Sequence, residues 1–234
     1  MRILKVAVLV AAFLLYGASG VAAAAPKDYC ADLKGVDTGM ACQIQLSDPG
    51  YNVDISFPTD YADQKSVADY ITQTRDAFLN VAKSSAPRDV PYELDITSTD
   101  YGSAIPPRGT QAVVFKVVQD VGTAQPQTTY KAFNWDQSYR KPIVYAPAAD
   151  DTKTTPLWRV ADPLKTVFPV VQSELQKQGV QVSPIAGHDP LSYQEFAVTN
   201  DGVIFFFSQG VLLPPGAAAT QVLVPRSVID PMLT

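Results

Sequence analysis

Alternating apolar and polar positions predict a pair of strands near the start of the chain. Val53, Ile55 and Phe57 are separated by single polar residues, the period of a strand with one buried face. Residues 43–46 alternate in the same way, and the Asp-Pro-Gly run at 48–50 interrupts the pattern between the two segments. We therefore expect two strands within 42–57, joined by a tight turn.

The clearest helical pattern covers residues 63–84. Asp63 and Ser66 offer the capping chemistry of a helix start, and Ser84, Ser85 and Pro87 end the pattern. The apolar residues that recur at helical spacing along one face are Val67, Tyr70, Ile71, Phe78, Val81 and Ala82.

A second helix is predicted over about 164–178. Val167, Phe168, Val171 and Leu175 share one face, and Gly179 is a suitable helix end. Pro169 restricts this helix, because proline inside a helix removes a backbone hydrogen bond. We expect Pro169 in the first turn or at a kink.

The remaining patterns predict mostly strands. Residues 146–156 have no apolar period and are expected to form a mobile surface loop. Strands that are joined by short turns form hairpins, which pair antiparallel. The sequence therefore predicts an α+β fold of two layers with a mainly antiparallel sheet and two main helices. The further expected elements are strands at 92–97, 111–118, 128–135, 143–145, 196–198, 203–207 and 221–224, a turn at 199–202 and a short closing helix at 227–232.

The first residues have the organisation of a secretory signal peptide. Arg2 and Lys5 precede an apolar run, and small residues follow up to Ala25. We expect cleavage after Ala24, because a cut after Ala25 would place Pro26 directly behind the scissile bond. The mature chain, 25–234, is then expected to be one secreted, extracellular α+β domain.

The charge of the mature chain excludes several functions. The whole chain has a formal net charge of −5, and the signal peptide removes two of its 18 basic side chains and none of its 23 acidic ones. An acidic chain without a basic run is a poor ligand for nucleic acid. No stretch of the mature chain approaches the ~18 apolar residues of a transmembrane helix.

Two cysteines, Cys30 and Cys42, are present in the whole chain. In an oxidising compartment they most simply form one disulfide. A reactive thiol pair is the alternative, but the spacing is not Cys-x-x-Cys, and neither a helix nor a basic cluster is evident beside either cysteine.

Catalytic patterns are scarce. His188 is the one histidine, in a loop beside the Asp189-Pro190 pair, and the mature chain has no Gly-x-Ser-x-Gly motif. We expect no metal site and no cofactor, since a zinc site lacks ligands and no phosphate-binding glycine motif occurs. Paired carboxylates remain open, although nothing marks two of them as convergent, and Asp150 and Asp151 are expected to be solvated.

The aromatic runs are expected to pack in the core. Phe205, Phe206 and Phe207 form a continuous apolar run, typical of a strand covered on both faces. Aromatic residues also recur between 130 and 139, where packing on paired strands and an exposed recognition surface are both possible interpretations. The residues concerned are Tyr130, Phe133, Trp135 and Tyr139.

Several segments resemble the mycobacterial family of secreted immunogenic antigens found in culture filtrates. The similar segments are 26–30, 42–45, 103–114, 129–137, 139–143, 196–207 and 221–227, and the chain departs from the family pattern around 146–162. The resemblance implies a secreted, antigenic, single-domain protein without established catalytic residues. The C-terminal part, about 110–234, resembles the extracytoplasmic domain of RsiV anti-sigma factors, which bind lysozyme. That domain also accompanies peptidoglycan-modifying enzymes, and it implies an α+β fold related to a β-grasp.

We therefore expect a protein that binds a host or cell-envelope partner and is not an enzyme. The candidate binding surface consists of Arg108, Tyr130, Tyr139 and Arg140. One alternative is a cell-envelope hydrolase that uses paired carboxylates. Another is peripheral membrane contact through residues 25–45, a segment that is neither strongly basic nor amphipathic at helical spacing.

Overall fold

A computed structural model describes residues 27–84, 90–105, 109–123, 125–146, 152–214 and 216–234. The predicted signal peptide with its cleavage site at Ala24 and Ala25 lies outside these residues, as do Arg108, Asp150 and Asp151. Among the described residues, no helix has the length and apolar character needed to cross a membrane.

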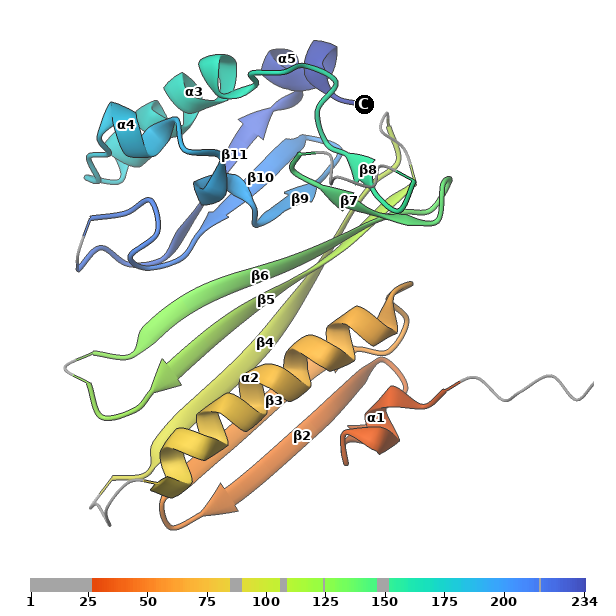
Figure 1. The fold of residues 1–234 in the computed structure, drawn as a ribbon, viewed down its shortest axis with the longest axis vertical. Helices are drawn as coiled ribbons and strands as arrows, with labels where there is room; N and C mark the ends of the chain where they lie inside the picture. The colour runs from red at the N-terminus through yellow and green to blue at the C-terminus, as the bar shows by residue number, and fades with distance from the viewer. Residues whose placement is uncertain (1–26, 85–89, 106–108, 124, 147–151, 215) are drawn as a thin grey trace, which may run out of the picture.

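The N-terminal half of the structure is a large sheet with one long helix on its face (Figure 1). The predicted strands at 42–57, the predicted helix over 63–84 and the strands that follow are confirmed. The elements are α1 (Tyr29–Asp32), β1 (Val36–Asp37), β2 (Ala41–Asp48), β3 (Tyr51–Pro58), α2 (Gln64–Ser84), β4 (Tyr92–Ser103), β5 (Thr110–Asp120), β6 (Gln127–Asp136), β7 (Lys141–Val144) and β8 (Thr155–Pro156), with the strands in sequence order across the sheet.

The C-terminal half is a small sheet covered by helices. Its three strands lie in the order β11-β10-β9, and all pair antiparallel. The predicted turn at 199–202 joins β9 to β10, as expected. The elements are α3 (Leu164–Lys177), α4 (Pro184–Gly187), η1 (Pro190–Tyr193), β9 (Phe196–Val198), β10 (Gly202–Phe207), β11 (Thr220–Pro225), α5 (Arg226–Ile229) and η2 (Asp230–Met232).

The predicted α+β class with a mainly antiparallel sheet is confirmed. In each half of the structure, one face of a sheet is covered by helix. Strand β5 shows how the two sheets are stacked. Val113, Phe115 and Val117 belong to the core beneath α2, whereas Ala112 and Val114 face the small sheet. This alternation follows from the two-residue period of a strand. The order of layers is therefore α2, large sheet, small sheet and the C-terminal helices (Figure 1). The predicted arrangement of two layers is corrected, because each of the two sheets carries its own helices.

Side chains of the C-terminal half cover the edge of β6. The backbone N–H groups of Thr128, Tyr130 and Ala132 point out of the sheet at alternate positions. They donate to Gln209 Oε1 (2.5 Å), Ser208 Oγ (2.8 Å) and Glu195 Oε2 (2.6 Å), respectively. An uncovered strand edge would offer these donors to another chain. These bonds therefore join the two halves and close the edge.

Several local expectations need correction. The β3–β4 pair is parallel, because α2 supplies the crossover between these strands. The segment expected to be a loop at 146–156 ends in β8, which pairs with β7. Pro169 is the sixth residue of α3, so it does not lie in the first turn, and the alternative of a kink stays a prediction. Cys30 lies in a short helix, α1, that the sequence pattern did not indicate.

Candidate functional site

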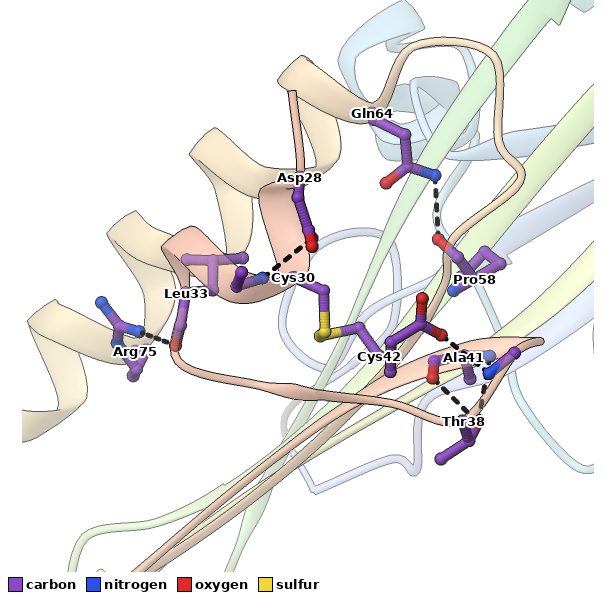
Figure 2. Close-up of a disulfide and its surroundings, with 12 residues drawn as sticks. Asp28, Cys30, Leu33, Thr38, Ala41, Cys42, Pro58, Gln64 and Arg75 are labelled. Carbon is purple, nitrogen blue, oxygen red and sulfur yellow. Dashed lines mark hydrogen bonds between the residues drawn. A yellow bond between two sulfur atoms is a disulfide. The ribbon is translucent and has the colours of Figure 1, made fainter. Parts of the chain in front are cut away.

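The disulfide between Cys30 and Cys42 ties α1 to β2 (Figure 2). Their Cα atoms are 5.6 Å apart, and both side chains are buried. Asp28 Oδ1 caps α1 by accepting the Ala31 N–H at 3.0 Å. Both cysteines of the chain are consumed in this bond, so the reactive thiol pair is excluded.

Gly35 lies against the disulfide and has no room for a side chain. A Cβ atom at this position would lie 2.3 Å from Cys42 Sγ and 2.9 Å from Cys30 Sγ. On the other side of α1, Arg75 Nη1 of α2 donates to the Leu33 carbonyl at 3.3 Å (Figure 2). The N-terminal segment is therefore held by one covalent and several polar contacts, which indicates a structural role.

The described residues of the candidate binding surface lie at different places along β6 and in the turn that follows it. Tyr130 lies on β6 and packs on Phe206 of the small sheet, with ring centroids 5.3 Å apart. Burial raises the pKa of the Tyr130 hydroxyl. Tyr139 is 70% exposed and lies with Arg140 in the turn after β6. Six strand residues separate Tyr130 from the end of β6, about 20 Å at the rise of a strand.

Tyr139 borders a small pocket at the end of β6. Asp136 shapes the turn there, because its Oδ1 accepts the N–H groups of Ser138 (2.9 Å) and Tyr139 (3.0 Å). The pocket has a volume of about 270 Å³ and holds one acidic side chain, that of Asp136. Its other lining residues are Ser138, Tyr139, Ile143, Thr155, Pro156, Leu157 and Thr234.

A larger pocket lies between the segment before α3 and the start of η1. Its volume is about 490 Å³, within the range of small-molecule sites. We call it the Tyr145 pocket. It is lined by Tyr145, Ala146, Trp158, Arg159, Val160, Ala161, Asp162, Pro163, Leu164, His188 and Pro190.

Two of the residues that line the Tyr145 pocket have a buried polar atom without a hydrogen-bond partner among the described residues. The Tyr145 hydroxyl and the Trp158 indole N–H are buried, and neither has a partner among the described residues. Their rings are in edge contact, with centroids 6.1 Å apart. Burial and the nearby Asp162 carboxylate raise the pKa of Tyr145, so its hydroxyl stays protonated at neutral pH. Both atoms are inaccessible to solvent, so they lie within the packing of these two side chains.

The charged side chains of this pocket are already engaged. Arg159 Nε donates to the Leu233 carbonyl at 2.5 Å, which fixes the guanidinium against the C-terminal tail. Asp162 pairs with Lys165 at 3.1 Å in a solvent-exposed ion pair. Asp162 is also the one acidic side chain that lines this pocket. Paired carboxylates thus converge in neither of the two pockets.

His188 is more fixed than the expected loop histidine. It caps α4, its Nδ1 lies 2.8 Å from the Pro184 carbonyl, and its ring packs on the edge of Phe168 with centroids 4.7 Å apart. Since a carbonyl only accepts, Nδ1 carries the proton in this contact and Nε2 is an acceptor when the ring is neutral. Gly187 allows this packing, because a Cβ there would lie 1.9 Å from Phe168.

Sequence reasoning missed this pocket as a unit. Tyr145 and Trp158 flank the segment expected to be a loop, and His188 is thirty residues further along the chain. Their side-chain types are common in cores, so no sequence signal marks them as partners. Within the part of the chain that the structure describes, no group of three or more His, Cys, Asp or Glu side chains could hold a metal ion.

Comparisons with known proteins cover the whole chain. It is 64% identical over 237 aligned residues to Immunogenic protein MPB64 of Mycobacterium bovis and to Immunogenic protein MPT64 of Mycobacterium tuberculosis, with 100% of each chain covered. It is 44% identical to Esterase Rv3036c of Mycobacterium tuberculosis, over 98% of both chains. Residues 156–227 match a family described as a protein of unknown function, DUF3298.

A DUF3298 protein is among the solved structures with a similar fold. It is a DUF3298 family protein from Pseudomonas aeruginosa PAO1, with a TM-score of 0.55 at 10% identity. The match covers 83% of this chain and 92% of that one. The DUF3298 match at 156–227 lies within the part of the sequence, about 110–234, that resembles the RsiV domain.

Proposed function

Because the chain belongs to the mycobacterial family of immunogenic proteins that includes MPB64 and MPT64, we propose that it is a secreted antigen that acts by binding a host or cell-envelope partner. The signal-peptide pattern of residues 1–24 supports export. Outside the cell, a protein of this kind works through its surface, so the exposed apolar side chains identify where a partner would bind.

The observation that carries the proposal is a pair of exposed apolar side chains beside the Tyr145 pocket. Ile185 on α4 is 90% exposed and Leu191 on η1 is 74% exposed. They flank His188 and Pro190, which line the pocket together with the partly exposed Val160. Apolar side chains in this position lose their contact with water when a partner covers them.

Saturable binding to mycobacterial cell wall and to host cells tests the proposal. We expect labelled mature protein to bind one of these preparations at micromolar concentration, and a variant with Ile185→Ser and Leu191→Ser to bind at least tenfold more weakly. The matched control changes two exposed apolar side chains of the N-terminal half, Val36→Ser and Met40→Ser, and should bind like the parent. Absence of saturable binding, or equal weakening by both double variants, contradicts the proposal.

Ester hydrolysis is the second candidate function. It is favoured by the 44% identity to a protein named esterase and by the position of His188 in the Tyr145 pocket. The lining residues include no Ser, Thr or Cys, so water would be the nucleophile. His188 Nε2 would take a proton from that water as its oxygen attacks the ester carbon, and would return the proton to the departing alkoxide.

Hydrolysis of p-nitrophenyl butyrate tests the candidate. Loss of activity in His188→Gln, with the fold retained, supports it. Activity that is absent in the parent, or unchanged by His188→Gln, contradicts it and leaves binding as the function.

A further inference from the structure

We infer that the pocket at the end of β6 is a binding site for a small organic cation, a primary ammonium group on a short apolar chain. The inference depends neither on the exposed pair Ile185 and Leu191 nor on ester hydrolysis. It rests on three observations: a buried carboxylate without a counter-ion, the sign of the charge in the pocket, and the exposed side chain of Tyr139.

The carboxylate of Asp136 is buried without a positive partner. The residue is only 8% exposed, and none of the ion pairs between described residues includes it. Lys141 lies opposite Asp136 in the β6–β7 pair, and no ion pair joins the two. A buried charge is costly in free energy unless an opposite charge compensates it. A cation in the pocket would supply that charge.

The second oxygen of this carboxylate is open to the pocket. Oδ1 of Asp136 accepts the N–H groups of Ser138 and Tyr139, whereas Oδ2 accepts no hydrogen bond from the described residues. The unpartnered polar atoms that solvent cannot reach belong, among those residues, to Asn134, Tyr145, Thr154 and Trp158. Oδ2 is not one of them, so solvent reaches it. Since Asp136 lines the pocket, an ammonium N–H can donate to Oδ2 there.

The lining gives the pocket one sign of charge. Among the described residues that line it, Asp136 is the one acidic residue, and none is Lys, Arg or His. An anionic ligand would therefore be repelled, whereas a cation gains a charge-assisted hydrogen bond. Ile143, Pro156 and Leu157 supply apolar surface, which favours a cation with a hydrocarbon chain over a bare ion. The volume of about 270 Å³ restricts that chain to a few carbon atoms.

Tyr139 adds a second means of binding a cation. It lines the same pocket, and its side chain is mostly exposed. The N–H of Tyr139 donates to Asp136 Oδ1 at 3.0 Å, so the carboxylate and the aromatic residue are held in one turn. The face of an aromatic ring attracts an ammonium group, which at an exposed site strengthens binding a few-fold.

n-Butylammonium and 1-butanol form a matched pair of probes, because they share one apolar chain and differ in charge. The amide signals of Ser138 and Tyr139 in a nuclear magnetic resonance spectrum report on the Asp136 carboxylate. The Gly50 amide is the control, since it donates to the exposed Asp48, which lines neither pocket. We expect n-butylammonium at millimolar concentration to shift the first two signals saturably, to leave Gly50 unmoved, and to bind at least tenfold more tightly than 1-butanol.

Three variants complete the experiment. Asp136→Asn keeps an oxygen that can accept the two N–H groups and removes the charge, so it should weaken n-butylammonium binding at least tenfold. Tyr139→Leu removes the ring and should weaken binding about threefold. Asp48→Asn removes a turn carboxylate outside the pocket and should leave the affinity unchanged. Shifts that do not saturate, equal affinity for 1-butanol, or unchanged binding by Asp136→Asn overturns the inference. If Asp136→Asn fails to fold, the two probes compared on the parent protein decide.

Two sources supply such a group, a free amine and the side chain of a lysine in a protein. Nα-acetyl-lysine N-methylamide has the ammonium group and four-carbon chain of n-butylammonium on a peptide backbone. Affinity equal to or above that of n-butylammonium assigns the pocket to a lysine side chain, and affinity at least tenfold lower assigns it to a free amine. Failure of both compounds to bind overturns the inference.

Discussion

The rings of Tyr145 and Tyr193 lie in contact, with centroids 6.3 Å apart, yet their hydroxyl groups differ in hydrogen bonding. The Tyr193 hydroxyl donates to the Gly187 carbonyl at 2.8 Å, whereas the Tyr145 hydroxyl has no partner among the described residues. Both side chains are buried in one core cluster. The two hydroxyl groups therefore differ: that of Tyr193 has a buried hydrogen-bond partner, and that of Tyr145 has none among the described residues.

Removing each hydroxyl should have opposite consequences for stability. Tyr193→Phe leaves the buried Gly187 carbonyl without its donor, and we expect the free energy of unfolding to fall by about 2 kcal/mol. Tyr145→Phe removes an unsatisfied group, so the free energy of unfolding should stay unchanged or rise by up to about 1 kcal/mol. Urea denaturation of both variants measures the difference. Equal destabilisation would show that Tyr145 has a structural partner.

Alkaline pH should unfold the protein through its buried tyrosines. Burial raises the pKa of Tyr61, Tyr145 and Tyr193 above the ordinary value of about 10. Below about pH 10 these groups are protonated in both states and contribute no pH dependence. Above it the unfolded chain loses protons that the folded chain retains, so stability should fall by about 1.4 kcal/mol per pH unit for each such tyrosine.

Tyrosinate absorbance and circular dichroism recorded together test this expectation. Most of the absorbance change from the buried tyrosines should coincide with loss of the fold. If these tyrosines ionise while the circular dichroism stays native, their burial does not control the alkaline transition.

Breaking the disulfide should loosen the N-terminal segment and leave the main core folded. Cys30→Ser opens a loop with a sequence separation of 12, which costs roughly 3 kcal/mol on the chain-entropy model. Hydrogen exchange should increase in residues 27–41, while the core beneath α2 keeps its protection. The disulfide-reduced parent is the control and should behave alike. Complete loss of the native fold in Cys30→Ser would show that the bond supports the whole domain.

The single-domain prediction can be tested with one tryptophan in each half. Trp135 packs against the core beneath α2, and Trp158 belongs to the C-terminal core. We expect the fluorescence of Trp135→Phe and Trp158→Phe variants to report the same urea midpoint, corrected for the stability change that each substitution causes. Separate midpoints would show two domains.

Arg226 is the residue that should couple these two halves. Its buried Nη2 donates to Ser103 Oγ of β4 and to the Thr199 carbonyl of the β9–β10 turn, both at 2.7 Å. Arg226→Lys supplies a single ammonium group in place of the planar fork and should lower the free energy of unfolding by about 2 kcal/mol. The same two-tryptophan experiment measures this loss. An unchanged midpoint would show that contacts other than those of Arg226 join the halves.

The spacing of apolar residues predicted most elements correctly, because it shows which face of a helix or strand is buried. Asp63 caps α2 as expected, with its Oδ1 accepting the Ser66 N–H at 3.2 Å, and the run 205–207 is buried on both faces of its strand. The patterns did not predict which element packs against a buried face or pairs with a strand. They did not indicate that β3 and β4 run parallel, nor that Tyr130 packs on Phe206 of the small sheet.

The sequence by itself determined the α+β class, the antigen family and the pairing of Cys30 with Cys42, since each depends on periodicity, on long matching segments or on the number of cysteines. The tertiary structure decided the stacking of the two sheets and the assembly of the Tyr145 pocket. A periodic pattern states that a side chain is buried but not against what, and the unpartnered hydroxyl of Tyr145 and N–H of Trp158 become visible only when all their neighbours are in place.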